Sequence, residues 1–273
     1  MDNISDPQDA EHIPVSRYFI EVTYKGGAYK GFQIQAEDIT IQSEVEKALH
    51  ILLKKNIRLT GSSRTDAGVH ALQNYFHFDT DLPNLSSKVY NINALLPRDI
   101  VVKNIFLVAD DAHCRFLATS REYQYRIYFK KDPFLYDRAW FYPFKLNTEI
   151  LHETAAIVKE YTDFTSFSKR NTQVKTCLCN IEISQWTETE NGLIYEVKGN
   201  RFLRGMVRGL VGTMLKAGKG IITPDEFRKI LEAKDCTKAD FSPPPQGLFL
   251  IAVNYPEGTL CSTPPHISNA AYQ

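Results

Sequence analysis

The sequence predicts an α+β fold in which two mixed domains share one continuous sheet. Three observations lead to this prediction. Strand-like segments, whose apolar residues recur with a period of two, are mixed with helix-like segments in both halves of the 273-residue chain. Asn191-Gly192 separates two strand-like segments, which is a strong hairpin signal. We find no internal repeat, low-complexity tract or long linker between the halves.

The first half begins with a strand over 17–25, which Gly26-Gly27 ends. Thr40 is placed to cap a helix that starts at Ile41 and continues with apolar residues at helical spacing. We then expect short strands over 57–63 and 75–79 around a loop over 64–70, a helix over 87–96 that ends at Pro97, and a strand over 100–108.

The second half contains one motif that predicts a helix start and one that predicts a hairpin turn. Thr223-Pro224-Asp225-Glu226 is a capping box with proline at the first helical position, and opens a helix to about Ala233. Asn191-Gly192 joins the strands of the hairpin. The elements expected here are a strand over 121–129, a helix over 149–161, strands over 180–187 and 193–199, a helix over 201–216 and a strand over 247–255.

These elements divide the chain into four parts. We expect an acidic flexible arm over 1–15, an α+β domain over 16–112, a second α+β domain over 113–257 and a flexible tail over 258–273. The tail is polar and contains proline, which is typical of loosely held chain ends.

Composition excludes several classes of protein. Basic and acidic residues number 32 each, so the chain lacks the strongly basic character common among nucleic-acid binders. No segment approaches the roughly 18 uninterrupted apolar residues of a membrane span, so we expect a soluble protein with no membrane partner. The N-terminus lacks the basic segment followed by an apolar segment that is typical of a signal peptide. Five cysteines without CxxC spacing support neither a disulfide framework nor a zinc site, so we expect no metal and a reducing cytoplasm.

Two local basic stretches remain within this neutral balance. No acidic residue lies between Lys198 and Lys219, and five cations between Arg115 and Lys131 accompany only Glu122. Such stretches neutralise phosphates in nucleic-acid binders, but on charge alone a solvated basic face explains them equally well.

The sharpest local feature is the turn-rich segment GSSRTDAGVHA over 61–71. It places Arg64 and Asp66 two residues apart in a short polar loop between strands, which is a common place for catalysis. The alternative is that Asp66 only hydrogen-bonds its own backbone in a turn. The pattern by itself leaves both interpretations open.

RTDAGVHA, in a chain of this length and order, closely resembles the signature of the TruA family of tRNA pseudouridine synthases. The resemblance runs from about Arg17 to Tyr255. Further matching blocks, in the family's order, are Tyr24-x-Gly26 with Tyr29-x-Gly31-Phe32-Gln33-x-Gln35, Asn93-Ala94-Leu95-Leu96-Pro97-x-Asp99-Ile100, Phe116-x-Ala118-Thr119-x-Arg121-x-Tyr123-x-Tyr125, Asp163-Phe164-Thr165-Ser166-Phe167, Phe202-Leu203-Arg204-x-Met206-Val207-Arg208 and Gly247-Leu248-x-Leu250.

The resemblance implies a pseudouridine synthase-like fold, with a largely antiparallel central sheet and helices outside. It implies a homodimeric enzyme that binds the anticodon stem-loop of tRNA and isomerises uridine at positions 38, 39 and 40. Asp66 would be the catalytic carboxylate, and no cofactor is needed because the reaction involves no redox step. Attack on C1', abstraction of a sugar proton and proton relay all remain open as its role.

The resemblance also assigns supporting roles. Arg208 would be the closer partner of Asp66, and Arg64 would help to hold the flipped nucleotide or its phosphates. Tyr123 would stack on the base or donate its hydroxyl group, because an extruded base needs a stacking surface. Leu248 and Leu250 would wall the uracil pocket, whereas His70 is expected to be structural.

Strand and helix geometry add three arginines to this candidate site. Arg121 lies on the strand face of Tyr123, where it could contact phosphate, and Tyr125, Ile127 and Phe129 on the same face are expected to be core. At about 100° per residue, Arg201, Arg204 and Arg208 fall within one arc of the predicted helix.

Three departures from the family pattern concern loop geometry. Ser63 replaces a usual glycine, Phe32 stands where tryptophan is common, and Pro243-Pro244-Pro245 stiffens the approach to Gly247.

Three rival interpretations fit the sequence less well. A non-catalytic RNA-binding protein would need no intact aspartate loop. An aspartic-type hydrolase would need a second Asp-x-Gly loop, which the sequence lacks. Membrane dimerisation through Gly205-x-x-x-Gly209 conflicts with Arg204 and Arg208 within the same segment.

Overall fold

The computed structural model describes residues 15–36, 38–170 and 174–260. The predicted arm over 1–15 and tail over 258–273 lie largely outside these ranges. The helices and strands, in chain order, are β1 (Ser16–Tyr24), α1 (Ile41–Leu53), β2 (Thr60–Gly61), β3 (His70–Thr80), α2 (Val89–Leu95), β4 (Ile100–Val108), β5 (Ser120–Tyr128), β6 (Trp140–Phe141), α3 (Thr148–Val158), β7 (Ile181–Thr189), β8 (Gly192–Gly199), α4 (Met206–Gly218), α5 (Pro224–Glu232) and β9 (Leu248–Asn254).

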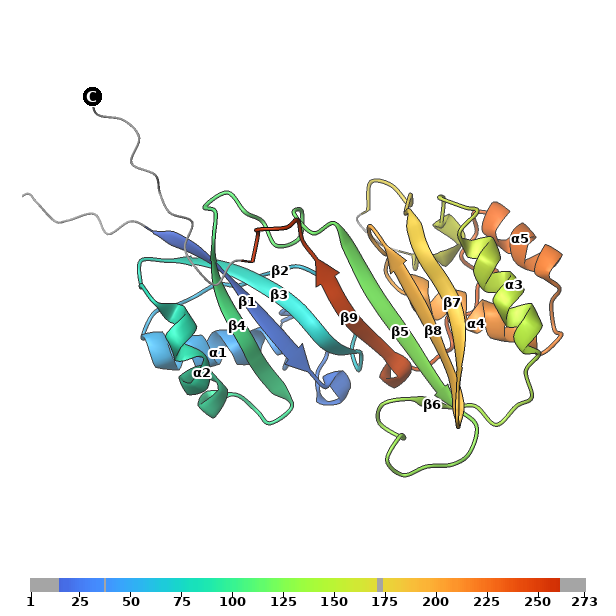
Figure 1. The fold of residues 1–273 in the computed structure, drawn as a ribbon, viewed down its shortest axis with the longest axis horizontal. Helices are drawn as coiled ribbons and strands as arrows, with labels where there is room; N and C mark the ends of the chain where they lie inside the picture. The colour runs from blue at the N-terminus through green and yellow to red at the C-terminus, as the bar shows by residue number, and fades with distance from the viewer. Residues whose placement is uncertain (1–14, 37, 171–173, 261–273) are drawn as a thin grey trace, which may run out of the picture.

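The strands form one open sheet in the order β4-β1-β3-β9-β5-β8-β7, with β2 paired to β3 and β6 to β5. All pairings are antiparallel except β3 with β9 and β5 with β6. Figure 1 shows α1 and α2 beside the half that contains β1, β3 and β4, and α3, α4 and α5 beside the half that contains β7 and β8. The predicted fold class is therefore confirmed.

β9 joins the two halves of the sheet. Although it comes last among the described strands, it lies between β3 and β5 (Figure 1). The parallel pairing with β3 is short, matching only His70 with Phe249 and Ala71 with Leu250, whereas the antiparallel pairing with β5 runs over most of the strand. Consequently a strand from the end of the second half closes the centre of the sheet.

The two predicted helix starts are confirmed. The Thr40 side chain accepts a hydrogen bond from the backbone N–H of Ser43, and the Ser43 hydroxyl accepts one from the N–H of Thr40. Thr223 and Glu226 form the same reciprocal arrangement at the start of α5. Each box satisfies backbone donors that the first turn leaves free, so these helices are fixed locally.

The strand predicted over 57–63 is wrong in extent, because only Thr60–Gly61 pairs with β3. Side chains of α1 satisfy the preceding backbone: Glu46 accepts the Leu59 N–H at 2.8 Å, and Gln42 donates to the Leu59 carbonyl at 2.8 Å. β3 starts at His70, earlier than predicted, so the loop ends one residue before its expected limit.

The predicted helix over 201–216 starts later, at Met206. Gly205, its N-cap, adopts a left-handed conformation with φ of +77°, which breaks the helical path after Arg204. Arg201 and Arg204 therefore lie in the loop before α4, and the prediction that they share a helical arc with Arg208 is wrong.

Two smaller corrections concern β5 and the hairpin. β5 ends at Tyr128, so Phe129 is 36% exposed and is not core, whereas Tyr125 and Ile127 are buried as predicted. The hairpin turn is formed by residues 190 and 191, and Gly192 is the first residue of β8. A Cβ at Gly192 would lie 2.0 Å from the carbonyl oxygen of Ile127, so close strand packing requires this glycine.

Candidate active site

The Asp66 loop, residues 62–69, connects β2 to β3 and is fixed from its inner side. The Thr65 hydroxyl lies 2.8 Å from the Tyr24 hydroxyl, and the Asn74 amide donates to the Tyr24 hydroxyl at 3.2 Å and to the Ser63 carbonyl at 2.7 Å. The Thr65 carbonyl accepts the Phe32 N–H at 3.1 Å. Buried hydrogen bonds of this kind are costly to break, so the loop has one defined path.

Asp66 lies at the outer side of this loop. Its carbonyl accepts the Val69 N–H at 3.2 Å, closing a turn in which Gly68 has φ of +81°. The Asp66 side chain is half-buried and accepts no hydrogen bond from any described residue. The capping of its own turn, the alternative to a catalytic role, does not occur. Arg64 is exposed and equally unpaired among the described residues.

β9 places Tyr123 one strand away from the start of β3, where the Asp66 loop ends. Leu250 pairs with Ala71 of β3 on one side and with Tyr123 of β5 on the other. Tyr123 is 8% exposed, and its ring meets Phe202 edge-on at 5.1 Å. Burial raises the pKa of Tyr123 to about 12, Arg121 opposes this rise and Asp66 adds to it. With its pKa raised, the Tyr123 hydroxyl stays protonated at neutral pH.

Arg208, on α4, makes a different contact from the one that the resemblance implies. Its Nε donates to the Pro243 carbonyl at 2.6 Å, and no ion pair joins it to Asp66 in the described parts of the chain. Tyr125 donates to the next carbonyl, that of Pro244, at 2.8 Å. We name residues 240–245 the proline strap, which these two side chains hold against the second half of the sheet.

The proline strap connects α4 to the Asp66 loop. A Cβ at Gly212 would lie 2.3 Å from the Asp240 carbonyl oxygen, and one at Gly68 would lie 2.8 Å from Pro245 Cγ. Both glycines thus permit a close approach of the strap. Arg208 contacts Pro243 and the Asp66 loop packs against Pro245, so the strap joins the two by direct contacts that the sequence does not reveal.

The other predicted site residues are placed as follows. The Arg121 guanidinium donates to the backbone carbonyls of Arg115, Ala118 and Asn200 at 2.7, 3.1 and 2.8 Å, so it holds the chain around the end of β5. Burial lowers its pKa. Arg204 is exposed and Arg201 half-buried, while Leu248 and Leu250 are 7% and 0% exposed and lie on β9.

Two departures from the family pattern prove compatible with the loop. Ser63 is not among the described residues with positive φ, so its backbone is not strained by the lack of glycine. Phe32 is 1% exposed and stacks on Phe76 at 4.3 Å, filling the space above Gly61, where a Cβ would lie 2.5 Å from the ring. Phe32 is therefore a core residue that supports the loop.

Sequence reasoning missed the residues that fix the loop from below. Tyr24 was expected only as part of a matching block and Asn74 not at all, yet Asn74 is 0% exposed and donates to the loop carbonyl of Ser63 and to the hydroxyl of Tyr24, which contacts Thr65. A polar amide within an otherwise apolar buried strand is the signal that could have identified it. His70 is structural, as expected: its Nδ1 accepts the Gly26 N–H at 3.1 Å, and its ring stacks on Phe249.

Comparison with known proteins agrees with this arrangement. A family model described as tRNA pseudouridine synthase matches residues 161–256. The chain is 44% identical to "tRNA pseudouridine synthase A" of Parabacteroides distasonis over 88% of its own length and 96% of the relative's. The protein of the same name from Bacteroides fragilis is 43% identical, over 90% and 98% of the two chains. The one from Bacillus subtilis is 41% identical, over 86% and 97%.

Identity at this level over nearly the full length of these relatives is much more specific than a match of single motifs. Together with the mostly antiparallel sheet, it shows that this chain belongs to the TruA family of tRNA pseudouridine synthases.

Proposed function

We propose that this enzyme converts uridine to pseudouridine in the anticodon stem-loop of tRNA, at positions 38, 39 and 40, with Asp66 as the essential carboxylate. Relatives named tRNA pseudouridine synthase A support the tRNA substrate. The observation that carries the role of Asp66 is that buried hydrogen bonds fix its loop, while its half-buried carboxylate has no hydrogen-bond partner among the described residues.

The chemistry requires a carboxylate that is available to the substrate. Isomerisation breaks the bond between ribose C1' and N1, joins C5 to C1' and releases the C5 proton. Asp66 is half-buried, and its oxygens are not used by any described residue, so they can meet a ribose or its protons. Tyr123, with a hydroxyl that remains protonated, can donate a hydrogen bond to the extruded uracil or stack on it.

The surrounding residues would bind the RNA. Arg64 and Arg204 are exposed cations that can neutralise phosphates, and Arg201 can join them from the same loop as Arg204. Arg121 and Arg208, whose donors bind backbone carbonyls, would hold the site in shape while their charge attracts phosphate. Leu248 and Leu250 would form the apolar floor of the uracil pocket.

The working form is proposed to be a cytoplasmic homodimer that acts without a cofactor. Its domains are proposed to span 16–112 and 113–257. Among the described residues, no helix has the length and apolar character needed to cross a membrane.

The test is release of tritium from tRNA whose uridines are labelled at C5. Wild type should release label without added cofactor, and Asp66→Asn, which removes the charge but preserves the size, should lower the rate by about 10²–10⁴-fold. Asp110→Asn, at an exposed position, is the matched control and should keep the wild-type rate.

Binding to tRNA, measured in parallel, separates chemistry from recognition. Asp66→Asn should bind tRNA with nearly wild-type affinity. A folded wild type that binds tRNA and releases no label from any tRNA would instead favour the non-catalytic RNA-binding function.

A further inference from the structure

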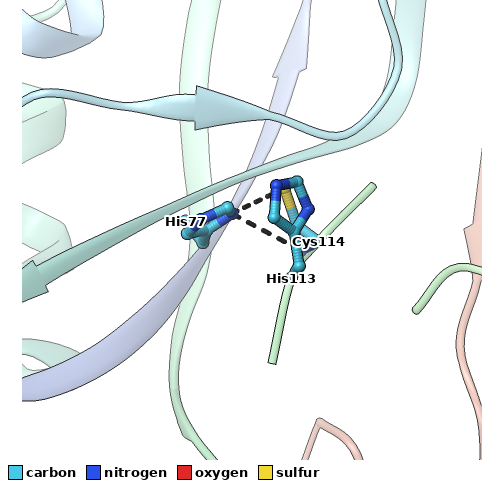
Figure 2. Close-up of side chains that lie close together, drawn as sticks. All are labelled: His77, His113 and Cys114. Atoms are coloured by element: carbon cyan, nitrogen blue, oxygen red, sulfur yellow. Dashed lines mark hydrogen bonds between the residues drawn. The ribbon is translucent and has the colours of Figure 1, made fainter. Parts of the chain in front are cut away.

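Three side chains of the kind that bind transition metals converge where the connector between β4 and β5 passes β3. His77 belongs to β3, and His113 and Cys114 lie in the connector. One candidate ligand atom from each lies within 4.8 Å of the others (Figure 2). His77 and Cys114 are buried and His113 is half-buried. No other such group of three occurs in the part of the chain that the structure describes.

The spacing of the cluster is close to that of a zinc site. His77 Nδ1 lies 3.1 Å from Cys114 Sγ, and the two imidazole centroids are 4.5 Å apart. Zinc bonds of about 2.1 Å to nitrogen and 2.3 Å to sulfur at a tetrahedral angle place these ligand atoms about 3.6 Å apart. An opening of a few tenths of an ångström would therefore admit the ion.

We propose that His77, His113 and Cys114 bind one Zn²⁺ ion that fastens the connector to β3. Two imidazoles and a thiolate are ligands that zinc prefers, and three protein ligands leave one position for water. Binding exchanges the thiol proton of Cys114 for the metal and releases that proton to solvent. The ion is structural and takes no part in the proposed isomerisation.

The position of Cys114 gives the ion a structural effect. The Cys114 carbonyl accepts hydrogen bonds from the Ser62 hydroxyl at 2.8 Å and from the Tyr255 hydroxyl at 2.6 Å. Ser62 opens the Asp66 loop, and Tyr255 follows β9. Fixing Cys114 therefore fixes the point where both are attached to the connector.

The charges and hydrogen bonds around the three side chains decide what must change for a dication to bind. Arg17 is the cation that acts on both histidines, and Asp79 offsets its charge through hydrogen bonds of 2.7 and 2.8 Å. The Cys114 thiol donates to the Thr60 carbonyl at 3.2 Å, His77 Nδ1 accepts the Cys114 N–H at 3.4 Å, and His113 Nδ1 accepts the Arg115 N–H at 3.2 Å. The ion replaces the thiol contact, and the backbone N–H contact of each histidine is given up where its Nδ1 is the ligand.

Cobalt titration of the full-length chain tests the proposal. After treatment with a chelator, wild type should take up one Co²⁺ per chain, with a near-ultraviolet sulfur-to-cobalt charge-transfer band, and Zn²⁺ should displace it. Cys114→Ser should abolish the band. Cys236→Ser, which removes a thiol outside the cluster, should keep it.

A second variant guards against misfolding of Cys114→Ser, which circular dichroism would reveal. His113→Ala alters a half-buried ring and should bind Co²⁺ at least about tenfold more weakly. Zn²⁺ should also raise the Tm of wild type but not of either variant. Failure of wild type to bind Co²⁺, or a band that survives in Cys114→Ser, would overturn the proposal. Neither result depends on whether the protein isomerises uridine.

Discussion

The Asp66 loop and the basic segment over 198–219 both stand out in the sequence, but the structure treats them differently. Around Asp66, buried groups fix the backbone and leave the carboxylate and Arg64 without partners among the described residues. In the basic segment, most cations are already occupied: Lys198 pairs with Glu182, and Lys216 pairs with Asp240.

This difference teaches that charge in a sequence does not measure charge available to a ligand. The loop offers few ionisable groups and keeps them free, whereas the basic segment offers many and uses most of them internally. Arg208 binds the proline strap, and Lys219 lies over the ring of Phe144 at 4.1 Å. Of that segment's arginines, Arg204 alone is exposed.

The largest expected effect is on the loop side. Asn74→Ala removes the donor to the Ser63 carbonyl and leaves that buried oxygen unpaired, which should lower the free energy of unfolding by about 2–3 kcal/mol. Tritium release should fall more than tRNA binding, because the path of the loop changes. Asn56→Ala, at an exposed position, is the control for denaturant unfolding. Equal stability of the two variants would show that the loop holds itself without Asn74.

The next effect is on the basic segment. Arg208→Met removes the donor to the Pro243 carbonyl and should cost about 1–2 kcal/mol of unfolding free energy, as judged by denaturant titration. The strap would loosen at Pro245, so the rate of isomerisation should fall as well. Arg98→Met, an exposed arginine, should change neither property. A lower rate with wild-type stability would favour direct contact of Arg208 with substrate instead.

A third prediction concerns His70, which lies where β3 pairs with β9 between the two halves of the sheet, and it is a dependence of stability on pH. Burial lowers the pKa of His70 in the folded protein below its usual 6.5. At a pH between the folded and the unfolded pKa, the unfolded chain therefore binds more protons than the folded one. The stability that neutral His70 provides is complete above pH 6.5 and is lost as the pH falls below it. His70→Asn should make the fall of Tm with pH shallower, while His77 and His113, whose pKa values burial also lowers, keep part of it; exposed His152→Asn should leave it unchanged. Parallel slopes for wild type and His70→Asn would contradict the assignment.

The smallest effect on stability should come from the exposed cation. Arg204→Ala should change the unfolding free energy by less than about 0.5 kcal/mol. It should nevertheless weaken tRNA binding and reduce the slope of log affinity against log salt by about 0.7–0.9, the value for one lost phosphate contact. Lys47→Ala, on α1, is the control. An unchanged salt slope would remove Arg204 from the proposed RNA surface.

Local patterns predicted most of the elements correctly. Strand β4, both capping boxes and the buried faces of Tyr125 and Ile127 depend on neighbours a few residues away, and these neighbours are present in the sequence. Predictions failed where distant groups replaced local ones. Side chains of α1 took the hydrogen bonds of Leu59, and the Lys169 N–H took the Arg204 carbonyl, beside the left-handed Gly205 after which α4 starts.

The candidate site was predictable only in part. The motif around Asp66 identified the loop and the family, whereas the roles of Asp66 and Tyr123 remain predictions. The contact of Arg208 with the proline strap was not predictable, because Pro243 lies 35 residues away. The same holds for His77 and Cys114, separated by 37 residues and without metal-site spacing.

The sequence by itself determined the α+β class, the order of most elements, the starts of the two capped helices and the family, because each depends on short-range periodicity, capping chemistry or contiguous motifs. Only the tertiary structure decided that β9 closes the sheet between β3 and β5, which cations remain available to a ligand, and that His77 meets Cys114. These outcomes depend on long-range packing and burial, which place residues together that no local pattern connects.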